Sequence, residues 1–263
     1  GEAEMIPPIM KNSRALLRIT SADRGVLLLH GFKGAPAEMK YLGERISERG
    51  YSISIPRLPG HGTVIQDLAR ASARDWLTAA REALVELKSH CREVYVAGLS
   101  MGAILTLLLA REYEIPKIVI LSAPRTLKEK SIYLAPLIGL FIKILWQEDP
   151  TMGLASEEAR LVHECYSQGT PIRQAWQLFR LIKKAMRALP FIESDALIIQ
   201  SAGDQVIPAD SMDYIYSHLA SRKKEKFLLQ KSNHAVTADL EKELVAERVI
   251  SFFDSPPGPL SKS

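Results

Sequence analysis

The strongest constraint on the fold is a repeated alternation of short apolar runs with helical stretches. Apolar runs at 26–30 and 52–56 flank a helical pattern near 37–49, and the run 94–98 follows a second helical pattern at 73–89. The runs are continuous rather than alternating, which is typical of parallel strands covered on both faces. This rhythm predicts an α/β fold with a mostly parallel central sheet flanked by helices.

The same rhythm continues to the C-terminal end of the chain. The segment 101–110 is apolar all round, as expected of a helix packed centrally against a sheet. Further strands are predicted at 117–122, 196–201 and 226–229, and further helices at 210–219 and 241–253.

One interruption separates the strands, because 125–195 shows helical patterns and no clear strand. A length of 263 residues corresponds to about 1.75 domains of 150 residues. We therefore expect a core at 1–124 and 196–254, a helical cap at 125–195, and a disordered proline-rich tail at 255–263. Two cap segments carry specific predictions.

The apolar segment 131–146 is too short for a membrane span and is predicted to form a covering helix over an acyl pocket. The pair Thr170 and Pro171 reads as an N-cap followed by proline at the first helical position, and apolar residues at helical spacing follow it. These residues predict either packing against the core or the wall of an apolar pocket, and packing is the safer interpretation for any one of them.

A GxSxG sequence at 98–102 lies directly between a predicted strand and a predicted helix. In that context the motif forms a sharp turn that exposes the hydroxyl of Ser100 as a nucleophile, and the glycines let neighbouring backbone pass closely. The alternative, a glycine-rich turn that merely opens a buried helix, is much less compatible with this placement.

A serine nucleophile needs a base and an acid, which follow it in this chain order on such a fold. Asp204 comes just after the predicted strand 196–201, and His234 follows the strand at 226–229. Because the carboxyl ends of parallel strands share one edge of the sheet, we expect Ser100, Asp204 and His234 to converge there.

The other histidines and acidic residues are weaker candidates for the base and the acid. His90, His163 and His218 fall within or at the ends of helical patterns, while His30 and His61 precede the acid and suit structural hydrogen bonds. Asp210, the main rival acid, stands where a helix should start and reads as a cap. Asp239 is interpreted as a structural or helix-start residue.

Acyl transfer also needs hydrogen-bond donors for the developing oxyanion. The predicted donors are two backbone amides, the N–H of Met101 after the nucleophile and the N–H of Phe32 in the turn after the first strand. No cofactor is required by this chemistry.

Charge and cysteine content exclude several classes of protein. The 34 Lys and Arg exceed the 30 Asp and Glu by only four, with half of the excess in 125–195, so a nucleic-acid partner is not expected. Cys91 and Cys165 have neither metal nor redox spacing and read as free thiols. The start lacks the pattern of a signal peptide, which predicts a cytoplasmic protein.

Taken together, the motifs HGFKG at 30–34, LPGHG at 58–62, GLSMG at 98–102, GD at 203–204 and NH at 233–234 resemble small bacterial carboxylesterases and monoacylglycerol lipases of the α/β-hydrolase fold. The resemblance covers 25–253 and is weakest in the cap. It implies a triad of Ser100, Asp204 and His234, an oxyanion hole at Phe32 and Met101, no cofactor or metal, and a cap over the acyl pocket. Lys33 is a departure from the family pattern, in which a threonine often follows HGF.

The leading hypothesis is a serine carboxylesterase that acts on short- to medium-chain esters, with an apolar acyl chain, through an acyl-enzyme. The runner-up is a monoacylglycerol lipase. Thioesterase activity and a non-catalytic ligand-binding protein rank lower, since fold alone does not fix function. No stable membrane insertion is expected, and an apolar cap also permits contact with lipid or a homodimer.

Overall fold

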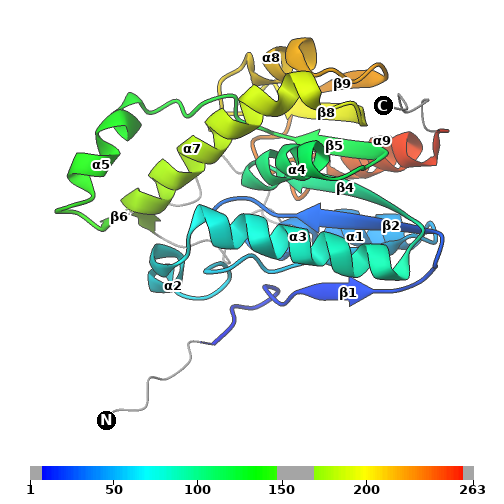
Figure 1. Cartoon of the computed structure of the whole chain (residues 1–263), viewed down its shortest axis with the longest axis horizontal. Helices are drawn as coiled ribbons and strands as arrows, with labels where there is room; N and C mark the ends of the chain where they lie inside the picture. Colours follow the sequence, from blue (N-terminus) through cyan, green and yellow to red (C-terminus); the bar gives the residue numbers. More distant parts are fainter. Residues whose placement is uncertain (1–7, 147–168, 257–263) are drawn as a thin grey trace.

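A seven-stranded sheet forms the centre of the protein (Figure 1). The computed structural model describes residues 8–146 and 169–256. The strands lie in the order β1-β3-β2-β4-β5-β8-β9, and every neighbouring pair except β1 with β3 is parallel. Their bounds are β1 (Leu16–Arg18), β2 (Arg24–Leu29), β3 (Ser52–Ile55), β4 (Glu93–Leu99), β5 (Lys117–Leu121), β8 (Asp195–Ser201) and β9 (Lys224–Leu229). The predicted mostly parallel α/β sheet is confirmed; the three-residue antiparallel strand β1 is not among the predicted elements.

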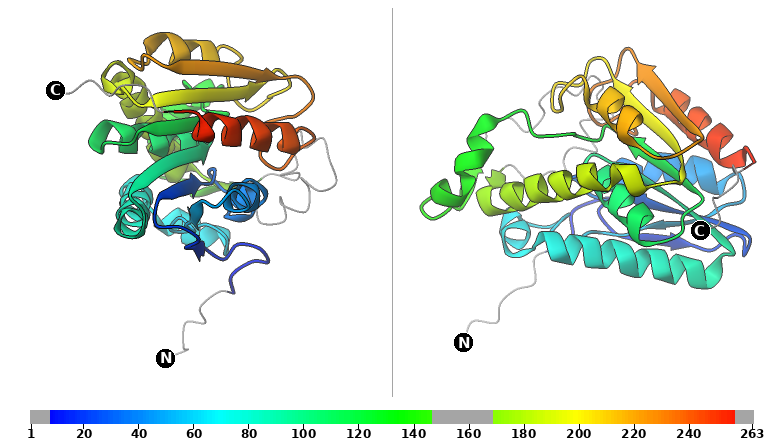
Figure 2. Two further views of the ribbon diagram at one scale, coloured as in Figure 1. Left: turned by 90° about the vertical axis from the view of Figure 1, so that its right-hand side faces the viewer. Right: turned by 45° about the horizontal axis from the view of Figure 1, so that its top comes forward.

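Helices cover both faces of this sheet (Figure 2). Alternate strand residues point to opposite sides: Leu27 and Leu29 pack with one layer of helices, whereas Val26 and Leu28 pack with the other. The first layer contains α3 (Ala73–His90), α4 (Met101–Glu112), α7 (Ile172–Ala188) and α8 (Ser211–His218), and the second contains α1 (Ala37–Ser47) and α9 (Lys242–Asp254).

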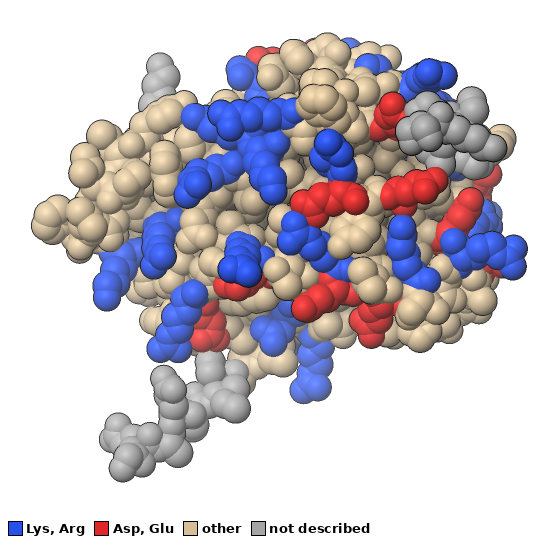
Figure 3. All heavy atoms as spheres, in the orientation of Figure 1, with Lys and Arg blue, Asp and Glu red and all other residues tan. Residues whose placement is uncertain are grey.

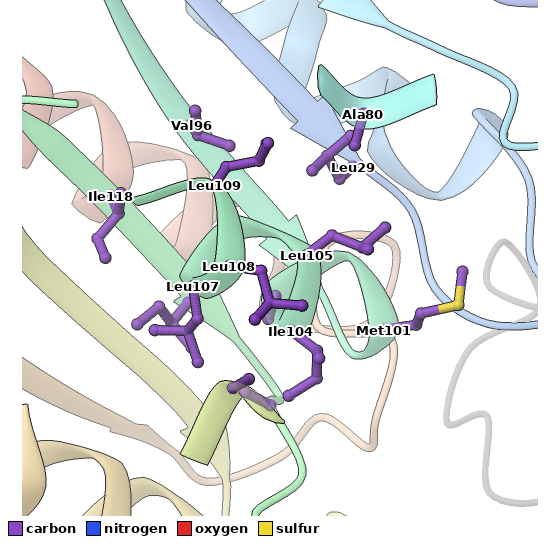
Figure 4. Packing of buried hydrophobic residues seen from close by; sticks show 14 of the residues in the cluster. Leu29, Ala80, Val96, Met101, Ile104, Leu105, Leu107, Leu108, Leu109 and Ile118 are labelled. Atoms are coloured by element: carbon purple, nitrogen blue, oxygen red, sulfur yellow. The ribbon is translucent and has the colours of Figure 1, made fainter. Parts of the chain in front are cut away.

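Helix α4 is buried on all sides, as its apolar sequence predicts. Nine consecutive residues from Met101 onward are buried, and Figure 4 shows Leu105 and Leu107 projecting from opposite sides of the helix. Because α7 packs against α4, neither face of these nine residues meets water. The helix that follows Ser100 is therefore held rigidly from every direction.

The segment 131–146 does not form the single covering helix that its apolar sequence predicts. It contains part of a 3-10 turn (Lys130–Leu134), the four-residue helix α5 (Ala135–Ile138) and the strand β6 (Ile144–Trp146). Proline is restricted to the first turn of a helix, and Pro136 stands there, while Gly139 ends the helix three residues later. Most of the large apolar side chains of the segment, including Leu140 and Phe141, are exposed, whereas Ile132 is buried.

The expectation that 125–195 lacks strands is also wrong. Strand β6 pairs antiparallel with β7 (Gly169–Pro171), so Thr170 and Pro171 lie in a strand and α7 begins at Ile172 with Pro171 at the N-cap position. Each strand has three residues and its partner is far away in sequence, so neither leaves a periodic pattern. Helix α7 shares a buried cluster with α4, which ties the described end of this segment to the core.

The surface near α5 and β6 is mainly apolar, whereas Lys and Arg gather over α7 (Figure 3). Two of the cations on α7 have nearby partners: Lys184 lies 4.0 Å from Glu112, and Lys183 lies over the ring of Phe179. No helix of the described residues is long and apolar enough to cross a membrane. Of the predicted disordered tail (255–263), residues 255–256 are described, and the N–H of Ser255 donates to the carbonyl of Ser251. The rest of the tail, His163 and Cys165 lie outside the described residues.

Candidate active site

Ser100 occupies a strained turn between β4 and α4. Its backbone has φ 54° and ψ −113°, in the left-handed half of the map where residues other than glycine are rarely found. Both motif glycines are required by close packing, because a Cβ on Gly98 would meet the carbonyl of Gly102 at 2.2 Å, and a Cβ on Gly102 would meet the carbonyl oxygen of Leu29 at 2.0 Å. The predicted nucleophile turn is thus present, held by contacts that no larger residue permits.

Asp204 and His234 form a hydrogen-bonded pair at the carboxyl ends of the strands. Nδ1 of His234 lies 2.7 Å from Oδ2 of Asp204, whose side chain is fully buried. The other carboxylate oxygen accepts the N–H groups of Val206 and Ile207. Burial acts to raise the pKa of Asp204, but the charge and hydrogen bond of His234 and these two amides outweigh it and lower the pKa.

The turn at Ser100 and the loop that carries His234 meet through the end of β5. The N–H of Ser100 donates to the carbonyl of Leu121 (2.9 Å), and the hydroxyl of the next residue, Ser122, donates to the carbonyl of His234 (2.8 Å). Ser122 itself is buried with φ 47°. The hydroxyl of Ser100 makes no hydrogen bond with the described residues; such contacts often tighten only when substrate binds.

The two predicted oxyanion donors have no acceptor among the described residues. Neither the N–H of Phe32 nor that of Met101 donates to a described group, and Met101 is the first residue of α4, where helix amides are unpaired. The carbonyl of Gly31 accepts from the Nδ1–H of His30 (2.9 Å), which orients the peptide that bears the Phe32 amide. These free amides are suited to binding an anionic oxygen.

His30 and His61 make structural hydrogen bonds, as the sequence predicts. Nε2 of His30 accepts the N–H of Leu58, so this ring is neutral with its proton on Nδ1. Nδ1 of His61 lies 3.0 Å from the carbonyl of Pro59. Burial lowers the pKa of His30 well below its ordinary value and that of His61 to about 4. Both rings are uncharged at neutral pH.

The remaining acids support neighbouring loops. Asp210 stands at the N-cap position of α8, but its carboxylate pairs with Arg125 (2.7 Å) instead of capping the helix. Asp239 accepts the N–H of Asn233, directly before His234, so its predicted structural role is confirmed. Glu241 accepts three amides and a hydroxyl of the same loop. His234 is therefore held by a loop with many internal bonds.

Two residues of the site are absent from the sequence-based prediction. Ser122 directly follows a strand at the same sheet edge as Ser100, a signal that was available. Glu38 is a buried acid whose Oε2 accepts the N–H of Gly31, next to the predicted oxyanion donor. The one signal in the sequence that could have indicated burial of Glu38 is its spacing, four residues before Leu42 and so on the same buried face of α1.

The chemistry of the site comes from these side chains and backbone amides. Among residues 8–146 and 169–256, no group of three or more His, Cys, Asp or Glu side chains is arranged to hold a metal ion. Cys91 is a buried free thiol, as predicted.

Comparison with known proteins agrees with this geometry. A family model described as serine aminopeptidase, S33, matches residues 20–241. The chain belongs to this α/β-hydrolase family. A thermostable monoacylglycerol lipase of Bacillus sp. (strain H-257) is 34% identical over 87% of the chain and 90% of its own length. A carboxylesterase of Bacillus subtilis (strain 168) is 28% identical over 88% of the chain and 93% of its own length.

A solved structure from a study of two metagenome-derived lipolytic enzymes, LipS and LipT, is also similar. It superimposes with a TM-score of 0.85 at 29% identity, covering 93% of this chain and 98% of its own. The resemblance seen in the motifs and the α/β-hydrolase fold are thereby confirmed for nearly the whole chain.

Proposed function

We propose that this S33-family chain is a serine carboxylesterase that hydrolyses short- to medium-chain esters through an acyl-enzyme. The coarser statement, that it is a carboxylic ester hydrolase of the esterase and lipase type, follows from its two curated relatives and the family match. The finer proposal assigns the nucleophile to Ser100, the base to His234, the acid to Asp204, and the oxyanion donors to the amides of Phe32 and Met101.

In the proposed reaction, Nε2 of His234 takes the proton of Ser100 while the hydroxyl oxygen attacks the ester carbonyl. The two amides stabilise the negative charge on the carbonyl oxygen, and His234 then returns the proton to the departing alcohol. Water attacks the acyl-enzyme by the same steps and releases the acid. Asp204 keeps the proton on Nδ1 and stabilises the imidazolium. No cofactor or metal enters these steps.

The observation that carries the proposal is the 2.7 Å pair of Asp204 with His234, joined through β5 to a strained Ser100. A glycine would adopt this backbone conformation without strain, so the presence of a serine here supports a chemical role for its hydroxyl. The pair accounts for a buried carboxylate oxygen, Oδ2 of Asp204, that would otherwise lack a hydrogen-bond partner.

A monoacylglycerol lipase is the second candidate, favoured by the 34% identical relative from Bacillus sp.. Both candidates use the same chemistry and need an ester with an apolar acyl chain as substrate. They differ in the recognition of a glycerol head group and in the acyl length accepted. We propose that 125–195 supplies that recognition as a cap on the core of 1–124 and 196–254.

The test is a hydrolysis series from acetate to palmitate esters, run beside monoacylglycerols of the same acyl lengths. The carboxylesterase proposal expects the highest kcat/KM on short or medium esters, with no gain from a glycerol head group. A maximum on long monoacylglycerols assigns the chain to the second candidate. An aminoacyl-p-nitroanilide included in the series checks amide hydrolysis, and turnover of that substrate alone would contradict both.

A further inference from the structure

A buried acid lies against the loop that presents one of the proposed oxyanion donors. Glu38, the second residue of α1, is 1% exposed, and its Oε2 accepts the N–H of Gly31 at 2.8 Å. Its other oxygen is buried with no hydrogen-bond partner. Burying a carboxyl group with one oxygen unpaired lowers the stability of the fold, so its presence calls for a functional explanation.

Among the residues that the structure describes, no cation pairs with this carboxyl. The titratable groups of the loops that carry the site have other partners: His30 contacts Gly31 and Leu58, Lys33 contacts Thr170, and His234 contacts Asp204. On its own helix, Lys40 lies 4.0 Å from Glu44. Burial therefore dominates and raises the pKa of Glu38 to about 8, although the Gly31 N–H acts to lower it. The group is a neutral acid over most of the neutral range.

The contact controls the backbone that carries the Phe32 amide. Glu38 fixes the peptide before Gly31, and His30 fixes the peptide after it, whose nitrogen belongs to Phe32. The carboxyl fills the space beneath the loop, because a Cβ on Gly34 would meet its Oε2 at 2.2 Å. Loss of the carboxyl would leave an unpaired amide and a void under the loop.

The carboxyl is also close to the reacting atoms. Oε2 of Glu38 and Cβ of Ser100 lie 3.3 Å and 3.5 Å from the point where a Cβ on Gly31 would be. Oε2 of Glu38 therefore lies about 7 Å or less from Cβ of Ser100. If the oxyanion formed at Ser100 lies at a similar distance, about 7 Å, a negative charge on Glu38 slows the reaction by about 50-fold at an effective dielectric constant near 20.

We propose that Glu38 is a positioning residue of this hydrolase: the neutral carboxyl holds the oxyanion loop in place, and its ionisation slows acyl transfer by putting a negative charge beneath the oxyanion. This rests on the proposed function, since it requires acyl transfer at Ser100. It does not require Glu38 to touch substrate.

The experiment compares kcat and KM of the wild type, Glu38→Gln and Glu38→Leu between pH 6 and 10 on a soluble p-nitrophenyl ester. Gln reproduces the neutral acid, with an oxygen for the Gly31 N–H and no charge to gain. We expect the wild-type kcat to fall at least tenfold on the alkaline side with a midpoint near pH 8. The Gln variant should keep kcat at pH 7 within about threefold and lose the alkaline fall, with KM changed little.

Glu44→Gln, on the exposed face of the same helix, is the matched control and should retain the wild-type profile. An alkaline fall that persists unchanged in Glu38→Gln overturns the ionisation step. A Gln variant at pH 7 as impaired as Glu38→Leu overturns the positioning role, because it shows that the neutral acid is not the active form. If the Leu variant does not fold, the Gln profile decides alone.

Failure of the proposed function would look different. In that case Ser100→Ala would keep its ester turnover at every pH. A serine-dependent activity with an unaltered profile in Glu38→Gln contradicts only the inference about Glu38.

Discussion

Asp204→Asn is the perturbation whose effect the geometry specifies most fully. In the wild type, one carboxylate oxygen faces Nδ1 of His234, and the other accepts the N–H groups of Val206 and Ile207 at 2.8 and 3.2 Å. An asparagine has only one oxygen. Two backbone donors hold that oxygen toward the loop, so the NH₂ group turns toward His234.

That orientation inverts the hydrogen bond to the histidine. An NH₂ donor requires Nδ1 to accept, which moves the ring proton to Nε2, and Nε2 can then no longer take the proton of Ser100. In a serine protease, the same exchange with intact geometry lowers kcat about 10⁴-fold, equivalent to about 5 kcal/mol of transition-state stabilisation. We expect a similar loss here, with KM changed little because the site still binds substrate.

The assay is steady-state hydrolysis of a p-nitrophenyl ester at pH 7.5, with imidazole ¹⁵N shifts to report the His234 tautomer. Asp210→Asn is the control, since Asp210 pairs with Arg125 at the surface and should cost less than twofold. Retention of more than a tenth of the wild-type kcat by Asp204→Asn, with folding intact, would refute the reasoning.

Three further predictions concern other buried groups. Ser122→Ala removes the buried bond to the His234 carbonyl and should lower both kcat and the free energy of unfolding, the latter by about 1–3 kcal/mol in urea titrations; an unchanged kcat would contradict it. Lys117→Met removes a buried ammonium that caps carbonyls at the end of α9, and should lower Tm in a thermal melt without changing the pH–rate profile. Because the native pKa of Glu38 is raised from 4.5 to about 8, the fold opposes its ionisation, and wild-type stability should fall as pH rises from about 5 to 8. The stability of Glu38→Gln relative to wild type should grow over that window by at most about 5 kcal/mol in urea titrations, and a pH-independent difference would refute this.

The sequence was most informative where one pattern had one physical solution. Short continuous apolar runs between helical patterns are typical of strands buried on both faces, and they are strands here. The glycines around Ser100 allow a close backbone approach, since an added Cβ would lie only 2.0–2.2 Å from a carbonyl group. Position then distinguished Asp204 from Asp210, since Asp204 comes just after a strand whereas Asp210 stands where the next helix begins. These arguments rest on local spacing and on the edge that parallel strands share.

The features that the sequence did not predict depend on contacts between residues far apart in the chain. Strands β6 and β7 pair across a long separation, and each is too short to show a period. Glu38 looks like an ordinary helix residue, because its partner Gly31 belongs to another element. The apolar run at 131–146 matched a helix in composition, but Pro136 and Gly139 limit the helix within it to four residues.

The most direct test of the account is covalent labelling of Ser100. The protein is treated with an organophosphonate, digested and analysed by mass spectrometry, beside Ser100→Ala treated in the same way. We predict one adduct, on the peptide that contains Ser100, with loss of ester turnover in proportion to labelling and no turnover by the alanine variant. An adduct on another residue, or full turnover by Ser100→Ala, would contradict the central claim.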